Sequence, residues 1–153
     1  MRAPVPPTRG VEDHDGPALA DLWVAAWRES SFAIDFEARR PWLMERLAAH
    51  RAAGGAIVVG LDADGQPAGF VAIDPATGYL DQLCVAPAQK GSGLAGALLA
   101  EARRLAAGPI ELDVNEANAR ARAFYAREGF IVVARGVSER SGLPTLRLRW
   151  TPA

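Results

Sequence analysis

The sequence is short of the residues that build disulfide frameworks and metal sites. Its 153 residues contain one cysteine, Cys84, and two histidines, His14 and His50. A single cysteine excludes an internal disulfide. Neither histidine has a cysteine or histidine partner at the spacing of a zinc ligand set. We therefore expect no metal site.

Long apolar runs and an excess of charge are also missing. No hydrophobic stretch reaches the roughly 18 residues of a membrane span, and residues 1–7 are Pro-rich, without the apolar core of a signal peptide. The net charge is −1, so nothing global recruits nucleic acid or an acidic membrane. We expect a cytoplasmic protein with a flexible N-terminus over residues 1–7, a single domain over residues 8–153, and no nucleic-acid or membrane partner.

The most informative stretch lies in the middle of the chain. A short apolar strand ends at Val85, Pro87 stops it, and a glycine-rich turn over residues 91–93 opens into a helix predicted over residues 94–106. The first N–H groups of a helix have no partner inside it, and the helix dipole adds about half a positive charge there. Glycines let a phosphate approach these groups closely. The sequence therefore predicts a phosphate-bearing ligand at this turn.

Two ligand classes compete for the turn. Residues 91–96 match the G-x-G-x-x-G pattern of dinucleotide-binding folds, and Asp113 lies near the distance at which such folds place a ribose-binding acid. In those folds, however, the first glycine follows the strand almost at once, whereas Gly91 is the sixth residue after Val85. The motif also begins past mid-chain, which leaves too little sequence for the usual nucleotide-binding halves.

Read instead as Leu83-x-Val85-x-Pro87-x-x-Lys90-Gly91-x-Gly93-x-Ala95, the stretch resembles the acetyl-CoA loop of the GNAT superfamily of N-acetyltransferases. In that family the loop wraps the pyrophosphate of coenzyme A. The usual arginine or glutamine at the first loop position is Lys90 here, a mild departure, because lysine also meets a phosphate as a point charge. The resemblance implies these cofactor-binding residues in the strand and loop: Leu83, Cys84, Val85, Lys90, Gly91, Ser92, Gly93, Leu94 and Ala95.

A second motif, from Asn118 to Phe130, adds to the resemblance. Asn118 and Tyr125 lie seven residues apart, so a helix places them on one face, about 10.5 Å apart along its axis. GNAT proteins use the matching positions on the coenzyme, the asparagine on the pantetheine–phosphate arm and the tyrosine near the sulfur. The other interpretation is an N-cap role for Asn118, which is compatible with a ligand contact, and core packing for Tyr125. The phosphate loop upstream favours the cofactor-binding role for both.

The predicted elements follow the GNAT order, β-α-α-β-β-β-α-β-α-β-β, over nearly the whole chain. We expect an α/β (α+β) GNAT fold with a mixed, mostly antiparallel central sheet of about seven strands, flanked by about four helices. Asp15 is predicted to cap the first helix. The strands over residues 79–85 and 110–114 are expected to pair in parallel. The other predicted strands cover residues 8–11, 56–61, 70–73, 131–137 and 145–150, and the later helices cover residues 37–51, 94–106 and 118–128.

The resemblance implies direct transfer of an acetyl group from acetyl-CoA to an amine acceptor in a ternary complex. A backbone N–H can serve the developing oxyanion, and GNAT strands resembling residues 83–85 carry a bulge that turns such an N–H toward the thioester. Tyr125 is the expected general acid for the departing thiolate. Asp81 and Asp113 are candidates for the general base, with a water relay as the alternative. Cys84 has no histidine nearby in sequence, which favours packing over a nucleophilic role.

The acceptor is the least specified part of this interpretation. In the family, the first two helices and the late strands form the acceptor site. Aromatic residues crowd the matching segments here, with charged residues interspersed, so Trp27, Phe32 and Asp35 are the substrate-binding candidates. Core packing is the alternative for the aromatic residues. Such a pocket suits a small-molecule or peptide amine. A coenzyme A-binding sensor without activity is the alternative outside enzymes, and a homodimer stays open.

Overall fold

The computed structural model describes residues 5–29 and 35–153. Within them, seven strands, four α-helices and two short 3-10 helices follow one another in the predicted order. The strands are β1 (Thr8–Gly10), β2 (Ala56–Leu61), β3 (Pro67–Ile73), β4 (Leu80–Val85), β5 (Ile110–Asn115), β6 (Ile131–Val137) and β7 (Pro144–Trp150). The helices are α1 (Gly16–Arg28), α2 (Arg40–Ala52), α3 (Leu94–Leu105) and α4 (Ala119–Arg127), with 3-10 turns at Asp13–Asp15 and Pro87–Gln89. The predicted fold class is confirmed.

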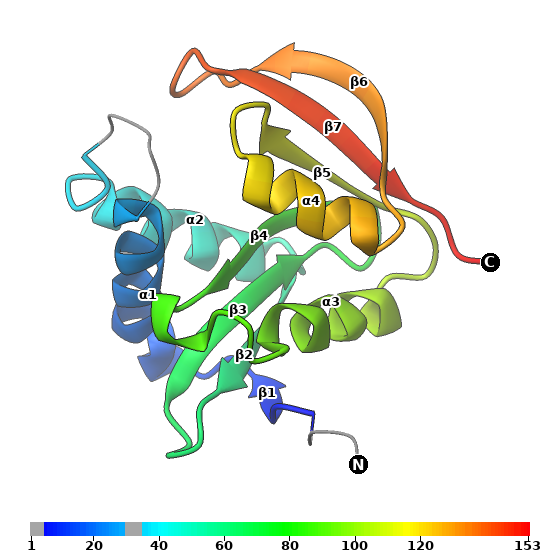
Figure 1. The fold of residues 1–153 in the computed structure, drawn as a ribbon. Coiled ribbons are helices and arrows are strands. Elements are labelled where there is room, and N and C mark those ends of the chain that lie inside the picture. The colour runs from blue at the N-terminus through cyan, green and yellow to red at the C-terminus, as the bar shows by residue number, and fades with distance from the viewer. Residues whose placement is uncertain (1–4, 30–34) are drawn as a thin grey trace.

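The strands form two sheets rather than one continuous sheet (Figure 1). β1, β2, β3 and β4 form an antiparallel four-stranded sheet, and β5, β7 and β6 form a three-stranded one. β4 and β5 meet in parallel at one bridge, Tyr79 to Glu111, where the Glu111 N–H donates to the Gly78 carbonyl at 3.0 Å. The parallel pairing predicted along the two strands is therefore wrong beyond this point. The strands diverge, and their facing edges carry no further ladder in the described residues.

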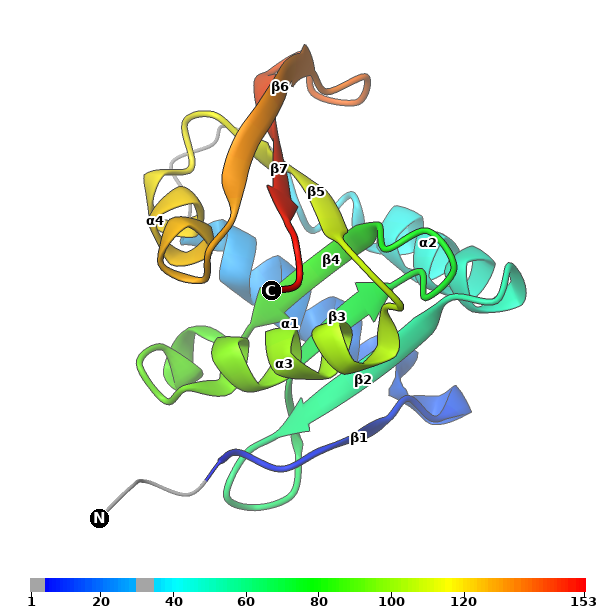
Figure 2. The ribbon, with the colours of Figure 1, turned by 90° about the vertical axis from the view of Figure 1, so that its right-hand side faces the viewer.

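Helices cover both faces of the four-stranded sheet (Figure 2). α3 packs on one face, and α1 and α2 pack on the other. Because successive side chains of a strand point to opposite faces, each strand feeds two cores. Val71 of β3 lies in the core under α3, whereas its neighbour Phe70 packs with α1 and α2. In β4, Leu83 and Val85 lean on the α3 side, and Cys84 is buried on the α1 side.

The start of α2 shows how local chemistry sets a boundary. The helix begins at Arg40, later than the predicted residue 37, because residues 36–39 form a turn. The Asp35 carboxylate accepts from the Ala38 N–H of that turn at 3.1 Å. Pro41 then occupies the first helical turn, where its missing N–H removes no hydrogen bond.

Asp15 does not cap α1, so that prediction is wrong. Its side chain is 1% exposed and accepts from the Arg9 guanidinium at 2.7 and 3.0 Å and from the Glu12 N–H at 2.7 Å. The carboxylate points toward β1 because the Arg9 guanidinium is a charged partner there, whereas the start of α1 offers only backbone N–H donors. The hydrogen bond from Arg9 lowers the pKa of Asp15 to about 2. The pair therefore ties β1 to the entry of α1.

Asp15→Asn should lower the stability of the protein and reduce its dependence on acid pH. At neutral pH we expect a loss of about 1–3 kcal/mol, because Arg9 loses its charged acceptor. The folded-state pKa of Asp15 is about 2, below the unfolded value of about 3.9. The stabilisation from this pair is therefore complete above about pH 4 and is lost as the pH falls through about 2. Thermal melts of both proteins from neutral to acid pH check this, and equal melting temperatures at neutral pH would contradict it.

None of the described helices combines the length and the apolar character needed to cross a bilayer.

Candidate active site

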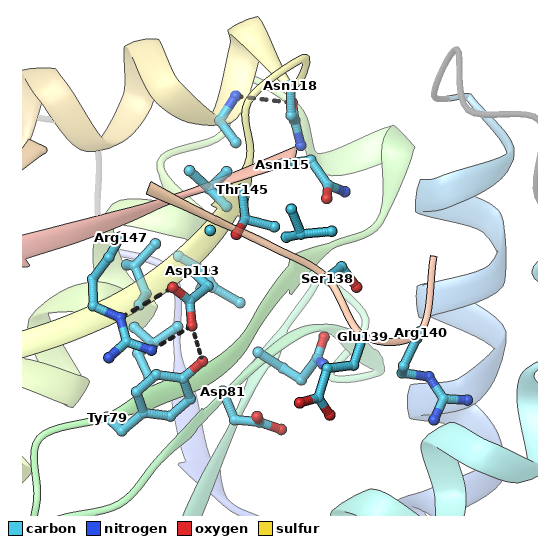
Figure 3. Close-up of a pocket in the computed structure, with 18 of the residues that line it drawn as sticks. Tyr79, Asp81, Asp113, Asn115, Asn118, Ser138, Glu139, Arg140, Thr145 and Arg147 are labelled. Carbon is cyan, nitrogen blue, oxygen red and sulfur yellow. Dashed lines mark hydrogen bonds and ion pairs between the residues drawn. The ribbon is translucent and has the colours of Figure 1, made fainter. Parts of the chain in front are cut away.

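Two cavities open where β4 and β5 part. The first, which we call the loop cavity, has a volume of about 630 Å³ and runs from the glycine loop along α4. The second, which we call the hairpin cavity, has a volume of about 730 Å³ and lies between β4, β5, α2 and the β6–β7 hairpin (Figure 3). Both cavities share part of their lining: Trp27, Leu83, Asn118, Ala121 and Tyr125. A ligand in one cavity can therefore meet a ligand in the other at Tyr125 and the middle of β4.

The turn before α3 offers free backbone donors to the loop cavity. Gly91 and Gly93 have φ angles of 81° and 87°, in the left-handed region where other residues are strained. The N–H groups of Gly91, Gly93, Ala95 and Gly96 find no backbone acceptor in the described residues. Together with the dipole of α3, these N–H groups are suited to bind an anion. Ser92 does not line the cavity, and its Oγ accepts from the Leu94 N–H at 3.3 Å.

Cationic side chains also line the loop cavity. Lys90 lines the loop cavity, but its Nζ lies 2.5 Å from a carboxylate oxygen of Glu29 at the end of α1. Arg120 and Arg127 of α4 also line it. They are seven residues apart and so share a helix face. Sequence reasoning missed these arginines, although the spacing that links Asn118 to Tyr125 also links them.

The edge of β4 that faces β5 supplies further unpaired groups. The Ala86 N–H donates to the Ala68 carbonyl of β3 at 2.8 Å. Hydrogen bonding alternates along an antiparallel strand, so the N–H and C=O groups of Leu83 and Val85 point away from β3, toward the space where β5 diverges. These groups are placed to bond a ligand that lies between the sheets.

The irregularity of β4 lies earlier than predicted. The ladder with β3 is regular from Gln82 to Val85, and the register shifts at Asp81, between the pairs of Gln82 and Leu80. The prediction of a bulge over residues 83–85 is therefore wrong. The divergence of β5, rather than a bulge, frees the backbone at these positions.

Cys84 has the environment of a packing residue. Burial raises the pKa of its thiol to about 12, and its side chain belongs to the core beside α1. A thiol that stays protonated at neutral pH is a poor nucleophile, as expected from the sequence, although the residue contributes to the lining of the loop cavity.

α4 places Asn118 and Tyr125 where the cavities meet. The Asn118 side chain accepts from the Ala121 N–H at 3.2 Å (Figure 3), so its N-cap role is confirmed and its amide nitrogen remains a donor. The Tyr125 ring packs edge-on against Phe124 and Phe130, with centroid distances of 5.2 Å to each. Burial raises the pKa of the Tyr125 phenol. The phenol therefore stays protonated at neutral pH and can donate a hydrogen bond into the junction.

Both candidate bases line the hairpin cavity, and both are ion-paired. Arg46 of α2 donates to Asp81 at 2.7 and 2.5 Å. Arg147 of β7 stands opposite Asp113 in the ladder and donates to it at 3.1 and 2.8 Å. The Tyr79 hydroxyl donates to Asp113 at 2.8 Å (Figure 3). The hydrogen bond from Arg147 lowers the pKa of Asp113, which weakens this carboxylate as a base.

The acceptor candidates are only partly brought together. Trp27 lines both cavities. Asp35 lines neither and caps the turn before α2, and Phe32 lies outside the described residues. Sequence reasoning missed several polar residues that line the hairpin cavity: Arg46, Tyr79, Asn115, Glu139, Arg140, Thr145 and Arg147. Only Thr145 and Arg147 carried a signal, because they lie on the polar face of the predicted last strand.

The sheet topology excludes a dinucleotide-binding fold. A dinucleotide-binding fold places its glycine turn within a parallel sheet, whereas β4 pairs antiparallel with β3 and touches β5 at one bridge. Within the described residues, no group of three or more potential metal ligands gathers.

Comparisons with known proteins agree with this geometry. The family model described as Acetyltransferase (GNAT) family matches residues 17–130. A GCN5-related N-acetyltransferase from Rhodopseudomonas palustris superposes with a TM-score of 0.81 and 20% identity, over 99% of both chains. A GNAT-family protein from Desulfovibrio desulfuricans gives a TM-score of 0.74 and 25% identity, over 96% of this chain and 99% of that one. The yncA protein of Salmonella typhimurium, solved with acetyl-CoA, gives a TM-score of 0.67 and 20% identity, over 95% of this chain and 93% of that one. No curated protein matches the sequence.

Proposed function

The chain belongs to the GNAT family of acetyltransferases, and on this basis we propose that it transfers an acetyl group directly from acetyl-CoA to an amine in a ternary complex. The observation that supports the proposal is the meeting of the two cavities at Leu83 and Tyr125. An anion-binding loop fills the far end of one cavity, and aromatic and charged side chains line the other. A donor and an acceptor bound in the two cavities would touch at this junction.

The residues of the loop cavity fit coenzyme A. Its pyrophosphate needs several donors in a small space, which the free N–H groups of the glycine loop can provide. Arg120 and Arg127 add positive charge for a phosphate along α4. The amide groups of the pantetheine arm match the unpaired backbone of Leu83 and Val85. The solved structure of yncA with acetyl-CoA supports this assignment by fold.

Acetyl-CoA supplies an activated thioester, and residues of this chain would stabilise the charges that develop in the reaction and transfer the protons. In balance, the amine nitrogen bonds to the acetyl carbon, the carbon–sulfur bond breaks, the nitrogen loses a proton and the sulfur gains one. We propose the N–H of Leu83 or Val85 for the oxyanion and the Tyr125 phenol as the donor to the sulfur. Asp81 and Asp113 remain base candidates, although their arginine partners favour a water relay.

Acetyl-CoA should protect the protein against heat. At 100-fold over its dissociation constant, a ligand that binds only the folded state adds about 2.7 kcal/mol. For a chain of this size the melting temperature should rise by about 5–10 °C. NAD and NADP at the same concentration should have no comparable effect. A shift with NAD and none with acetyl-CoA would overturn the assignment of the loop cavity.

An amine panel separates an enzyme from a coenzyme A-binding sensor. The protein and acetyl-CoA would be incubated with n-butylamine, tyramine, spermidine and a short peptide with a free amino terminus. We expect thiol release together with an N-acetylated product, detected by mass spectrometry, for at least one of these amines. Binding of acetyl-CoA without any product would support the sensor.

A further inference from the structure

The tip of the β6–β7 hairpin is held over the hairpin cavity by defined contacts. The Ser138 N–H donates to the Leu143 carbonyl at 2.9 Å, and the Gly142 N–H donates to the Ser138 carbonyl at 2.8 Å. The Arg140 Cζ lies 3.9 Å from the ring centroid of Trp42 in α2, within the range of a cation–π contact. The tip therefore reaches from the three-stranded sheet to α2.

Glu139, next to Arg140 at this tip, lines the hairpin cavity and is exposed to solvent. Both Glu139 and Arg140 line the cavity, and Figure 3 shows the Glu139 carboxylate on the side of Asp81 and the Arg140 guanidinium pointing away from it. The carboxylates of the cavity lining belong to Asp81, Asp113 and Glu139. Asp81 holds Arg46 and Asp113 holds Arg147. Among the described residues, the Glu139 carboxylate has no ion-pair or hydrogen-bond partner, so the negative charge that the cavity offers to a ligand is that of Glu139.

The arginine side chains near the hairpin tip do not pair with the Glu139 carboxylate. Arg46 is neutralised by Asp81. Arg140 stacks on Trp42, where burial and the charges of Arg39 and Arg46 lower the pKa of its guanidinium. Arg140 therefore contacts α2 through Trp42 and makes no hydrogen bond or ion pair with Glu139 in the described residues.

We propose, resting on the proposed function, that Glu139 binds the acceptor amine in its protonated form, before the nitrogen loses its proton, and that Arg140 is the positioning residue that holds Glu139 in the cavity lining. A carboxylate and an ammonium form a charge-assisted hydrogen bond, which is about twice as strong as a neutral one. The acceptor class that follows is a primary amine on a neutral or cationic carbon skeleton. An amine with a carboxylate beside its nitrogen would meet Glu139 with like charge.

Glu139→Gln tests the proposal, with the amine of the panel that the wild type acetylates at the lowest KM as the probe. We expect the KM for this amine to rise about tenfold, with kcat and the KM for acetyl-CoA little changed. Glu139→Asp keeps the charge and should recover part of the loss. Glu45→Gln is the matched control, because it removes the same charge from α2 outside both cavities. A wild-type KM in Glu139→Gln, or an equal rise in Glu45→Gln, would overturn the proposal. A wild type that acetylates no amine would instead refute the proposed function.

A double-variant cycle tests the role of Arg140. Arg140→Leu should raise the same KM by a similar factor, and the double variant with Glu139→Gln should rise no further, because both changes remove one interaction. If the two effects multiply, Arg140 itself contacts the acceptor and the positioning role is wrong. Thermal melts with and without acetyl-CoA confirm that each variant folds and binds the coenzyme.

Discussion

Gly93→Val should abolish coenzyme binding in a protein that still folds. Gly93 has a φ angle of 87° and directly precedes α3. A Cβ at this position would meet no protein atom within 4 Å, so folding suffers only the backbone strain, about 1–3 kcal/mol. The valine methyl groups would stand in front of the free N–H groups that a phosphate must reach. We expect the affinity for acetyl-CoA, measured by calorimetry, to fall by about 100-fold or more, equivalent to about 2.7 kcal/mol.

Gly65→Val is the matched control for this prediction. Gly65 has a φ angle of 76°, a Cβ there would also meet nothing within 4 Å, and the residue lies in the β2–β3 turn outside both cavities. Both variants should lose similar stability, and only Gly93→Val should lose binding. Equal loss of affinity in the two would show a general effect of destabilisation. Unchanged affinity in Gly93→Val would place the coenzyme elsewhere.

Tyr125→Phe should lower kcat by about 100-fold, within the range for a general acid, with little change in coenzyme affinity. The phenylalanine ring keeps the edge-on contacts with Phe124 and Phe130 and loses only the hydroxyl. Because negative charge develops on sulfur as the bond breaks, the missing donor matters in the transition state more than in binding. The loss should shrink with an acyl donor whose thiol is more acidic, since that sulfur needs less help to leave.

Single-turnover kinetics with the best amine of the panel measure this effect. Tyr79→Phe is a useful comparison, because it removes the hydroxyl of the other tyrosine in the chain, which is bound to Asp113. Tyr79→Phe should lower the stability of the protein, and its kcat should fall much less than that of Tyr125→Phe. Wild-type turnover in Tyr125→Phe would show that Tyr125 only packs. Equal losses of binding and turnover would make it a positioning residue.

Local rules predicted the elements that build the loop cavity. A proline after a strand, glycines before a helix and an asparagine at a helix start each act within a few residues, and the structure has β4, α3 and the Asn118 cap where these signals lie. Period-two alternation likewise predicted the last strand: Leu146 and Leu148 are buried, and Arg147 and Arg149 are exposed. The anion site needed no more than this, because its donors come from one continuous stretch of backbone.

Pairing with an arginine set the state of both base candidates and of Asp15. Asp81 is held by Arg46, 35 residues earlier, and Asp113 by Arg147, 34 residues later. Asp15 turns to Arg9 on β1 rather than to the helix it precedes. The basicity of a carboxylate depends on the charge beside it, and local spacing does not show which distant charge that will be. The base candidates were therefore visible in the sequence without their partners.

The sequence by itself determined the fold class, the order of the elements and the glycine loop, because each follows from backbone geometry and side-chain periodicity over short stretches. Only the tertiary structure decided that β4 and β5 part after one bridge and that the backbone of Leu83 and Val85 is thereby freed. It also decided that the hairpin tip contacts α2 through Arg140 and places Glu139 in the cavity lining. These features depend on the register between strands and on contacts between elements far apart in the chain. That information is held in the packing of the whole molecule and not in any one segment.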